Sequence, residues 1–258
     1  MNPETQFRLA VFFIMLLMMM SWEAFAPRRS TQKRALRWPA NLGIVALNAV
    51  MLFLIPVSAV GAALFSVFNH FGLFIYLKLP LWPSIILSLL LLDLAIYWQH
   101  RLFHAIPRAW PIHRMHHTDT EFDVTTALRF HPLEILISIV IKAAVIILLG
   151  VPVLAAVAFE IILNATAMFN HANIKLPAFA DKVLRLILVT PDMHRVHHAL
   201  HDAEYNSNYG FNLSVWDRLF GSYTAGPRDG HREMQIGQRR YRDPLEARLD
   251  KLLTQPFR

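Results

Sequence analysis

The chain has 258 residues, and 55% of them are hydrophobic, which is more than a soluble enzyme of this length usually contains. It has no cysteine, which excludes disulfides, thiolate zinc sites, iron–sulfur clusters and thiolate-ligated haem. Lys and Arg number 25 against 18 Asp and Glu, a net charge of +7. A basic balance is compatible with nucleic acid, anionic lipid or membrane topology; topology is the simplest explanation, and we expect no nucleic-acid partner.

The first apolar segment runs from Leu9 to Met20. Ala24 and Ala26 imitate a signal-peptidase site, but the basic run at 28–37 follows the apolar segment instead of preceding it. The segment is therefore predicted to remain as an uncleaved span. Positive residues favour the cytoplasmic side, so the loop after this span is predicted to be cytoplasmic.

Four further apolar segments follow. A second span is predicted from about Leu42 to Phe65, and a third returns from about Ile85 to His104, which places the end of the third at the cytoplasmic face. Leu133 to Leu149 and Val151 to Phe169 are joined by a turn at Gly150. Because a full crossing needs about 20 residues, both a shallow hairpin and two complete spans remain open.

Two charges interrupt the predicted hairpin. Lys142 and Glu160 stand at similar distances on either side of the turn, where antiparallel helices would bring them together. An unpaired charge inside a membrane is costly, so we predict that the two side chains form an ion pair. The alternative is that one of them reaches the interface or faces a polar cavity.

These segments predict an all-α fold: an integral-membrane, multi-pass helical bundle with a cytoplasmic helical cap that carries the chemistry. We divide the chain into N-terminal transmembrane helices with a basic loop (1–81), a core that carries the histidines (82–224) and a cytoplasmic tail (225–258). The tail is rich in arginine and is predicted to lie near anionic lipid.

The first of three histidine clusters closes the third span. His100 and His104 are four residues apart and share a helix face with Tyr97 and Asp93. An acid inside a span needs a reason, and orienting a metal-bound imidazole is one. Asp93 and Tyr97 are therefore candidate supporting residues, although a histidine pair alone would be typical of a solvated helix face.

Two later clusters share a single spacing. They consist of His113, His116 and His117, and of His194, His197 and His198. Thr190 and Pro191 predict that a helix begins just before the third cluster. Imidazole suits iron, zinc, copper and nickel, and eight or nine imidazoles exceed the needs of one metal but fit two. Candidate acidic partners near the clusters are Asp119, Glu121, Asp123, Asp192 and Glu204.

The residues from about Ser84 to Tyr223 resemble the fatty acid hydroxylase and sterol desaturase superfamily. The resemblance rests on the segments Asp93 to His104, His113 to His117, Leu128 to Glu134, His194 to His198, Asn208 to Gly210 and Trp216 to Gly221. It implies an all-helical membrane oxygenase with two iron ions, which zinc could replace in purified samples. Such an enzyme uses O2 to hydroxylate or desaturate a lipid; which lipid, which carbon and which of the two outcomes stay open.

The resemblance also implies a set of metal ligands. They are His100, His104, His113, His116, His117, His171, His194, His197 and His198. His131 is expected to cap the hairpin or to line the site, and His201 to lie at the surface or behind the ligands. His70 and His231 are far from the clusters and are expected to have no role in the site.

Three other protein classes were weighed. A histidine-lined metal transporter would place ligands near the bilayer midplane, whereas these cluster at one face. A zinc hydrolase would need fewer ligands and the paired-histidine-with-glutamate helix, which is missing. A haem bundle would use only two axial histidines per haem. The chain has no haem, flavin or iron–sulfur motif of its own, so an oxygenase would need electrons from a separate donor.

Overall fold

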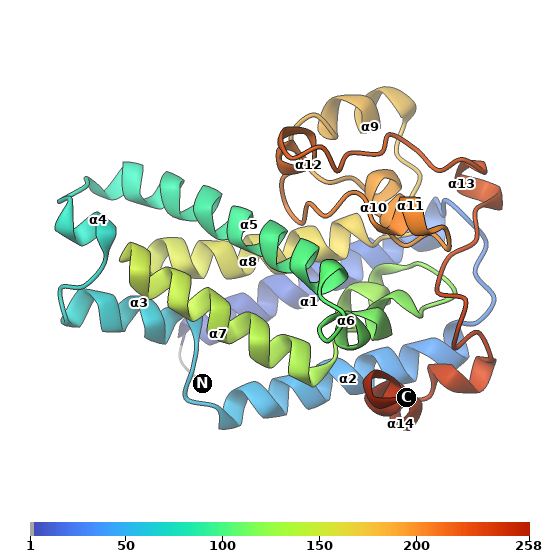
Figure 1. Ribbon diagram of the computed structural model, residues 1–258, viewed down its shortest axis with the longest axis horizontal. Helices are drawn as coiled ribbons and strands as arrows, with labels where there is room; N and C mark the ends of the chain where they lie inside the picture. The colour runs from blue at the N-terminus through green and yellow to red at the C-terminus, as the bar shows by residue number, and fades with distance from the viewer. Residues whose placement is uncertain (1–2) are drawn as a thin grey trace.

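The computed structural model describes residues 3–258, with side chains from Thr5 onward, and its regular elements in this range are all helices (Figure 1). The prediction of an all-helical fold is confirmed. The longer helices are α1 (Pro3–Phe25), α2 (Arg34–Leu54), α3 (Ala59–Phe68), α5 (Leu81–Ala105), α7 (Pro132–Leu149) and α8 (Val153–Asn170). Three isolated β-bridges are the only strand-like pairings in the described part of the chain.

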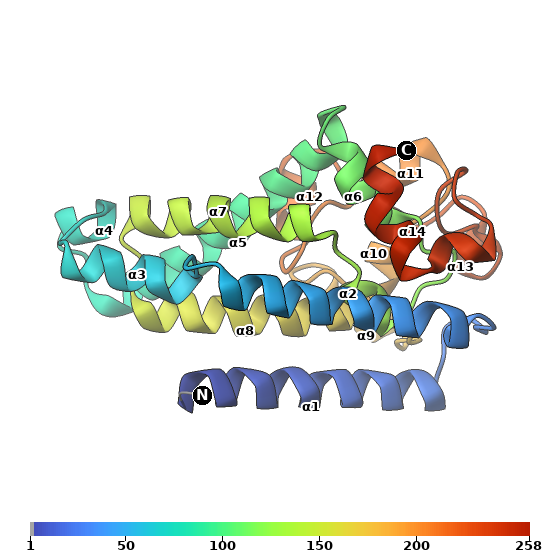
Figure 2. The same ribbon diagram turned by 90° about the horizontal axis from the view of Figure 1, so that it is seen from below.

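The shorter helices lie mainly at one end of the bundle. They are α4 (Leu73–Tyr76), α6 (Trp110–His117), η1 (Val124–Leu128), α9 (Ala178–Leu184), α10 (Pro191–His197), α11 (Asp202–Tyr205), α12 (Val215–Leu219), α13 (Gly230–Glu233), η2 (Pro244–Ala247), α14 (Leu249–Thr254) and η3 (Gln255–Phe257). Except for α4, they form a cap at the end where the loop between α1 and α2 also lies (Figures 1 and 2). The cap and the basic loop therefore share one end of the molecule.

Among the described residues, five helical segments are long and apolar enough to cross a membrane. They are Thr5–Phe25, Arg34–Tyr76, Leu81–Ala105, Pro132–Leu149 and Val153–Asn170. The last two have 18 residues each, or about 27 Å of helix, close to the thickness of a hydrocarbon core of about 30 Å. Apolar side chains from α3, α5, α7 and α8 form the largest buried cluster of the bundle.

The predicted second span from Leu42 to Phe65 lies within the candidate span Arg34–Tyr76, but this segment is not one continuous helix. α2 ends at Leu54, and Ile55 is extended, with φ of −98° and ψ of 127°. Pro56 explains the break, because proline disfavours helical conformation in the residue before it and cannot donate a backbone hydrogen bond. Ser58 then starts α3 by accepting a hydrogen bond from the Gly61 backbone N–H at 2.9 Å.

Two glycine turns meet at the end of the bundle opposite the cap. Gly150 ends α7 with φ of 69°, and Gly72 begins α4 with φ of 126°. A Cβ atom on Gly72 would lie 2.3 Å from both Cα and N of Gly150. Only glycine at position 72 allows the two backbones to approach this closely.

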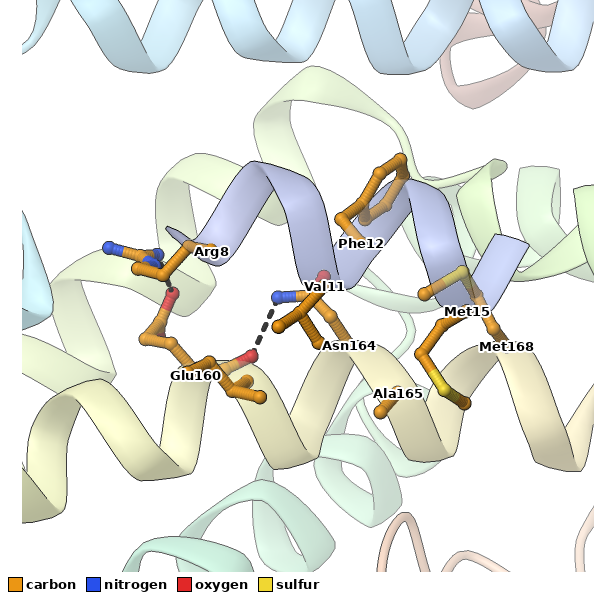
Figure 3. Close-up of a pocket in the computed structure, with 9 residues that line it drawn as sticks. Arg8, Val11, Phe12, Met15, Glu160, Asn164, Ala165 and Met168 are labelled. Carbon is orange, nitrogen blue, oxygen red and sulfur yellow. Dashed lines mark hydrogen bonds and ion pairs between the residues drawn. The ribbon is translucent and has the colours of Figure 1, made fainter. Parts of the chain in front are cut away.

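The predicted contact between Lys142 and Glu160 is confirmed: the two side chains form an ion pair between α7 and α8. Arg8 of α1 joins them, with its Nη2 atom 3.1 Å from Oε2 of Glu160. Figure 3 shows this contact at one end of a crevice of about 250 Å³ between α1 and α8, which Met15 and Met168 line at the other end. The buried carboxylate is thus compensated by two cations.

The last residues fold back onto the cap and the start of α2. Leu252 of α14 is buried against Ala40 and Ile44, and Leu249 packs on Gly43. The Thr118 hydroxyl, just after α6, donates a hydrogen bond to the Gln255 side chain at 2.9 Å. The C-terminal segment therefore supports the helix that carries the second histidine cluster.

Candidate metal centre

Nine buried or half-buried imidazoles converge in the cap and form two groups. The first group is His100, His104, His113, His117 and His197, and the second is His116, His171, His194 and His198. Within each group, one candidate ligand atom per residue lies within 4.8 Å of every other. The structure thus brings together all nine histidines that the sequence indicated.

The cap end of α5 supplies two imidazoles to the first group. His100 and His104 are one turn apart, so their rings lie side by side with centroids 5.2 Å apart. α6 divides its histidines because of their spacing. His113 and His117, four residues apart, face the first group, whereas His116 faces the second.

The histidines of α10, together with His198 directly after it, are divided in the opposite way. His194 and His198 belong to the second group and His197 to the first. The helix begins as predicted, since Thr190 accepts a hydrogen bond from the Met193 backbone N–H at 3.4 Å and Pro191 occupies the first turn. α6 and α10 therefore each contribute to both groups.

Hydrogen bonds from Nδ1 orient several of these rings. The backbone acceptors are Tyr209 for His100 at 2.8 Å, Ser207 for His197 at 2.7 Å, Ala167 for His171 at 2.8 Å and Arg129 for His116 at 3.2 Å. A carbonyl oxygen only accepts, so the proton of each ring is on Nδ1 and the lone pair is on Nε2. Each of these Nε2 atoms is therefore in the form that binds a metal.

The second group shows why a cation fits. The Nε2 atoms of His116 and His171 lie 3.1 Å apart, yet both rings have their proton on Nδ1, so neither nitrogen can donate to the other. Two lone pairs at this distance repel each other. Nitrogens that share one metal at about 2.1 Å are separated by roughly 3.0 to 3.4 Å, and this spacing matches.

Further ring nitrogens are buried without a hydrogen-bond partner in the described part of the chain. They include Nε2 of His100 and of His197, and both ring nitrogens of His104 and of His198. Because buried polar atoms rarely stay unpaired, these orphans indicate that the donor set is built around cations. Burial also lowers the pKa of His171 to about 4 and that of His197 to about 3, which keeps both rings neutral.

Glu134 is a supporting residue that we did not single out from the sequence. Its Oε1 atom lies 2.7 Å from Nδ1 of His113, and both side chains are buried. It is the carboxylate that contacts a ligand imidazole among the described residues. The sequence offered one indication of its role, because Glu134 is an acid in the first turn of the otherwise apolar helix α7.

Asp93 contacts a cap loop instead of a histidine. It accepts hydrogen bonds from the Trp216 indole at 2.8 Å and from the backbone N–H groups of Asn212 and Leu213 at 3.3 and 3.2 Å. Its carboxylate is thus paired with buried polar groups, as expected for an acid in a span. Asp93 therefore influences the position of the imidazoles only through this loop.

The same loop is held by Asp217, which accepts hydrogen bonds from the backbone N–H groups of Tyr209 and Gly210 at 2.7 and 2.8 Å. Burial raises the pKa of Asp217 to about 6. A Cβ on Gly210 would lie 2.6 Å from Asp217 Oδ2, so glycine is needed there. Because the Tyr209 carbonyl orients His100, Asp217 acts on that ligand through the backbone.

Tyr97 also supports this region without touching a ligand nitrogen. Its hydroxyl lies 2.8 Å from Oγ of Ser222, and its ring stacks on Phe220 with a centroid distance of 5.3 Å. Ser222 in turn donates to Asp217 at 2.6 Å. Tyr97 therefore belongs to the hydrogen-bond network that holds the loop.

The five acids named as candidate partners contact other groups. Asp119, Glu121 and Asp123 bind the buried guanidinium of Arg37, Asp192 binds Arg28 and Arg195, and Glu204 accepts from the Arg228 backbone N–H. In the described chain none of them contacts one of the nine imidazoles. Except for Glu204, whose partner lies in the cap itself, they connect the basic loop and α2 to the cap.

The four remaining histidines lie outside both groups. His131 caps α7, accepting from the Leu133 backbone N–H at 3.1 Å, which confirms one of its two expected roles. His201 lies 3.2 Å from Asp229, and His231 is 3.6 Å from Asp192. His70 is exposed in the turn before α4.

The helical bundle thus combines five described segments that are long and apolar enough to cross a membrane with two groups of imidazoles that could each hold a metal ion. The family model for fatty acid hydroxylase matches residues 85–222, more than half of the chain. The protein belongs to the fatty acid hydroxylase family. The predicted resemblance is confirmed, and the match includes all nine clustered histidines, from His100 to His198.

Curated relatives of the chain act on lipids according to their names. The chain is 31% identical over 158 residues to ornithine lipid hydroxylase of Rhizobium tropici, covering 60% of this chain and 47% of the relative. It is 30% identical to human alkylglycerol monooxygenase over 137 residues (52% and 29%) and 28% identical to the Delta(7)-sterol 5(6)-desaturase erg3C of Aspergillus fumigatus over 165 residues (56% and 50%). The chain thus spans half or less of the length of these relatives. No solved structure matches it.

Proposed function

We propose that the protein is a membrane-bound, O2-dependent oxygenase that hydroxylates or desaturates a hydrocarbon chain of a lipid. The observation that carries the proposal is the pair of all-nitrogen ligand groups, buried side by side at one end of an apolar bundle. Hydroxylation is the first product to test, because the relatives that are at least 30% identical are named hydroxylase and monooxygenase.

Two iron ions are the metals that this proposal requires, one for each group of imidazoles. When bound, such a pair supplies the oxidising power for a C–H bond, which no amino-acid side chain has. The chain's own part is to hold neutral nitrogens, to orient them through backbone carbonyls and Glu134, and to exclude water by burial. Zinc would occupy the same nitrogens in a purified sample.

The substrate is proposed to approach the first group from the side of His104. His104 is the one half-buried member of the nine, and the Trp110 ring lies 4.7 Å from it. Tyr205 stacks on Trp110 at 5.5 Å and completes an aromatic wall. A lipid chain fits this surrounding, since the faces of the aromatic rings offer it apolar surface and shield it from water.

We infer that the cap and its metal site face the cytoplasm. The loop between α1 and α2 carries Arg28, Arg29 and Lys33 at the cap end of the bundle, and positive residues favour the cytoplasmic side. The proposal keeps the three parts inferred from the sequence, with spans in 1–81, the histidine core in 82–224 and a tail in 225–258. Electrons would come from a separate donor.

The test is oxidation of a lipid extract by the detergent-solubilised, iron-loaded protein with a chemical electron donor and heavy-isotope O2. A lipid product that gains one labelled oxygen atom, or loses two hydrogens only when O2 is present, would support the proposal. His198→Ala should abolish this oxidation, because it removes a buried ligand of the second group.

The control is His70→Asn. His70 is exposed in a turn with φ of 50°, and asparagine tolerates this conformation. The variant should retain oxidation and metal content. Wild-type activity in His198→Ala would overturn the proposal. So would a wild type that moves metal across vesicle membranes and oxidises no lipid, and this result would favour the transporter alternative.

A further inference from the structure

The cap exposes an apolar patch that lies outside the five candidate spans. We call it the α9–α12 patch; it consists of Phe179, Val183, Leu184, Leu186, Ile187 and Leu219. Phe179 is 79% exposed, Ile187 61% and Leu219 68%. Apolar side chains gathered on the surface of a folded domain mark a place of contact with another apolar phase or molecule.

The patch is amphipathic along α9. Phe179, Val183 and Leu186 follow the spacing of one helix face, and the helical turn continues past the end of α9 through the bond from Leu188 N–H to Leu184 C=O at 2.8 Å. The opposite face is tied to the cap, where Arg185 donates to the Ala225 carbonyl at 2.7 Å. The apolar face therefore has a fixed direction.

The patch is continuous with the lipid-facing side of α5. The Ser214 backbone N–H, just before α12, donates to the Ile187 carbonyl at 2.9 Å, which joins α9 to α12. At the end of α12, the Phe220 ring lies 4.9 Å from that of Trp98, which is 40% exposed on α5. Figure 1 shows α9 and α12 at the outer edge of the cap, beside the end of the bundle.

Positive charge surrounds the patch. Lys175 and Lys182 are exposed near the two ends of α9, and Arg218 is exposed beside Leu219. The acid of this helix, Asp181, is engaged by Arg185. A helix with an apolar face and a basic rim is typical of segments that lie in the head-group layer of an anionic membrane.

We propose that the α9–α12 patch is a membrane-surface contact that inserts into the anionic head-group layer beside α5. This goes beyond the proposed reaction and does not depend on it. The contact sets the depth of the metal centre, since α10 begins at Pro191 directly after the patch and the Val189 N–H bonds to the Asn212 carbonyl at 3.0 Å. The third histidine cluster is thereby held at the surface of the leaflet.

The absence of cysteine allows a direct test on the full chain. Single-cysteine variants Phe179→Cys and Leu186→Cys carry a polarity-sensitive fluorophore in nanodiscs of phosphatidylcholine and phosphatidylglycerol. Ile86→Cys on α5 provides the lipid-exposed reference, and Glu233→Cys on the exposed helix α13 provides the aqueous reference. All four positions are exposed, so each label leaves the core packing unchanged.

The labels at 179 and 186 should emit at shorter wavelength than the label at 233, lose quenching by iodide and gain quenching by a nitroxide lipid. Protection of the label from iodide should be greater in nanodiscs that contain phosphatidylglycerol than in nanodiscs of phosphatidylcholine alone. In the Phe179→Cys background, Lys182→Gln should reduce this difference, and Arg232→Gln should not. Iodide quenching equal to that at 233 would overturn the proposal. A label that is protected from iodide but not reached by the nitroxide lipid would also overturn it, because protein would then cover the patch.

Discussion

Glu134 offers a sharp test of the candidate metal centre. In Glu134→Gln the amide oxygen can still accept a hydrogen bond from His113 Nδ1, but the negative charge next to the ligand is lost. The bond is short, 2.7 Å, and both side chains are buried, so the charge acts on the imidazole with little screening. Loss of such a partner typically lowers metal affinity by about 10- to 100-fold, or about 1.4 to 2.7 kcal/mol.

The measurement is a competition between the protein and a chelator for Fe(II) under anaerobic conditions, with metal content read by mass spectrometry. Glu204→Gln is the matched control: Glu204 is also buried, and it accepts a bond of the same length, 2.7 Å, but from the Arg228 backbone N–H. Its affinity should stay at the wild-type value. Unchanged affinity in Glu134→Gln, or an equal loss in both variants, would refute the argument that the carboxylate supports His113.

Three further outcomes are expected. Lys142→Met should lower the stability of the bundle in thermal unfolding by about 3 kcal/mol. This is near the low end for breaking a buried ion pair, because Arg8 still contacts Glu160. Adding Glu160→Leu to this variant should restore most of the lost stability. Asp93→Asn should cost about 1 to 3 kcal/mol and weaken metal binding, since it disturbs the loop that orients a ligand; wild-type stability and affinity together would contradict this. The metal-free protein should lose stability as the pH falls from 6.5 towards 4, because the imidazoles of the unfolded chain bind protons in this range and those of the folded chain do not. The loss should be about 1.4 kcal/mol per pH unit for each imidazole such as His171 or His197. If the free energy of unfolding, measured with a denaturant, does not change with pH below 6.5, this expectation is wrong.

The sequence predicted the parts of the fold that depend on local pattern. Runs of apolar residues marked the spans, and the spacing of the histidines marked the centre, because both signals lie within a few helical turns. The ion pair of Lys142 and Glu160 was predictable for the same reason, since a turn relates the two residues directly. Pro56, which explains the break after α2, was also a local signal, but the prediction of the second span did not use it.

The hydrogen-bond partners of the imidazoles were harder to predict. Most of them are backbone carbonyls, such as those of Tyr209 and Ser207, and a carbonyl has no signature in the sequence. Asp93 was expected to orient an imidazole, but its side-chain partner, Trp216, lies 123 residues away, and only the tertiary fold brings the two together. Nearness in sequence led us to Asp119 and Glu121 as partners, although a buried arginine, Arg37, binds both.

The division of α6 and α10 between the two ligand groups limits what single substitutions reveal. A change at His116 that tilts α6 also displaces His113 and His117, which belong to the other group. Effects of residues that act as one unit do not add, so the losses measured for individual histidine variants will sum to more than the whole activity. The two groups are therefore coupled through these two helices, and a variant that displaces α6 or α10 will not report on one group alone.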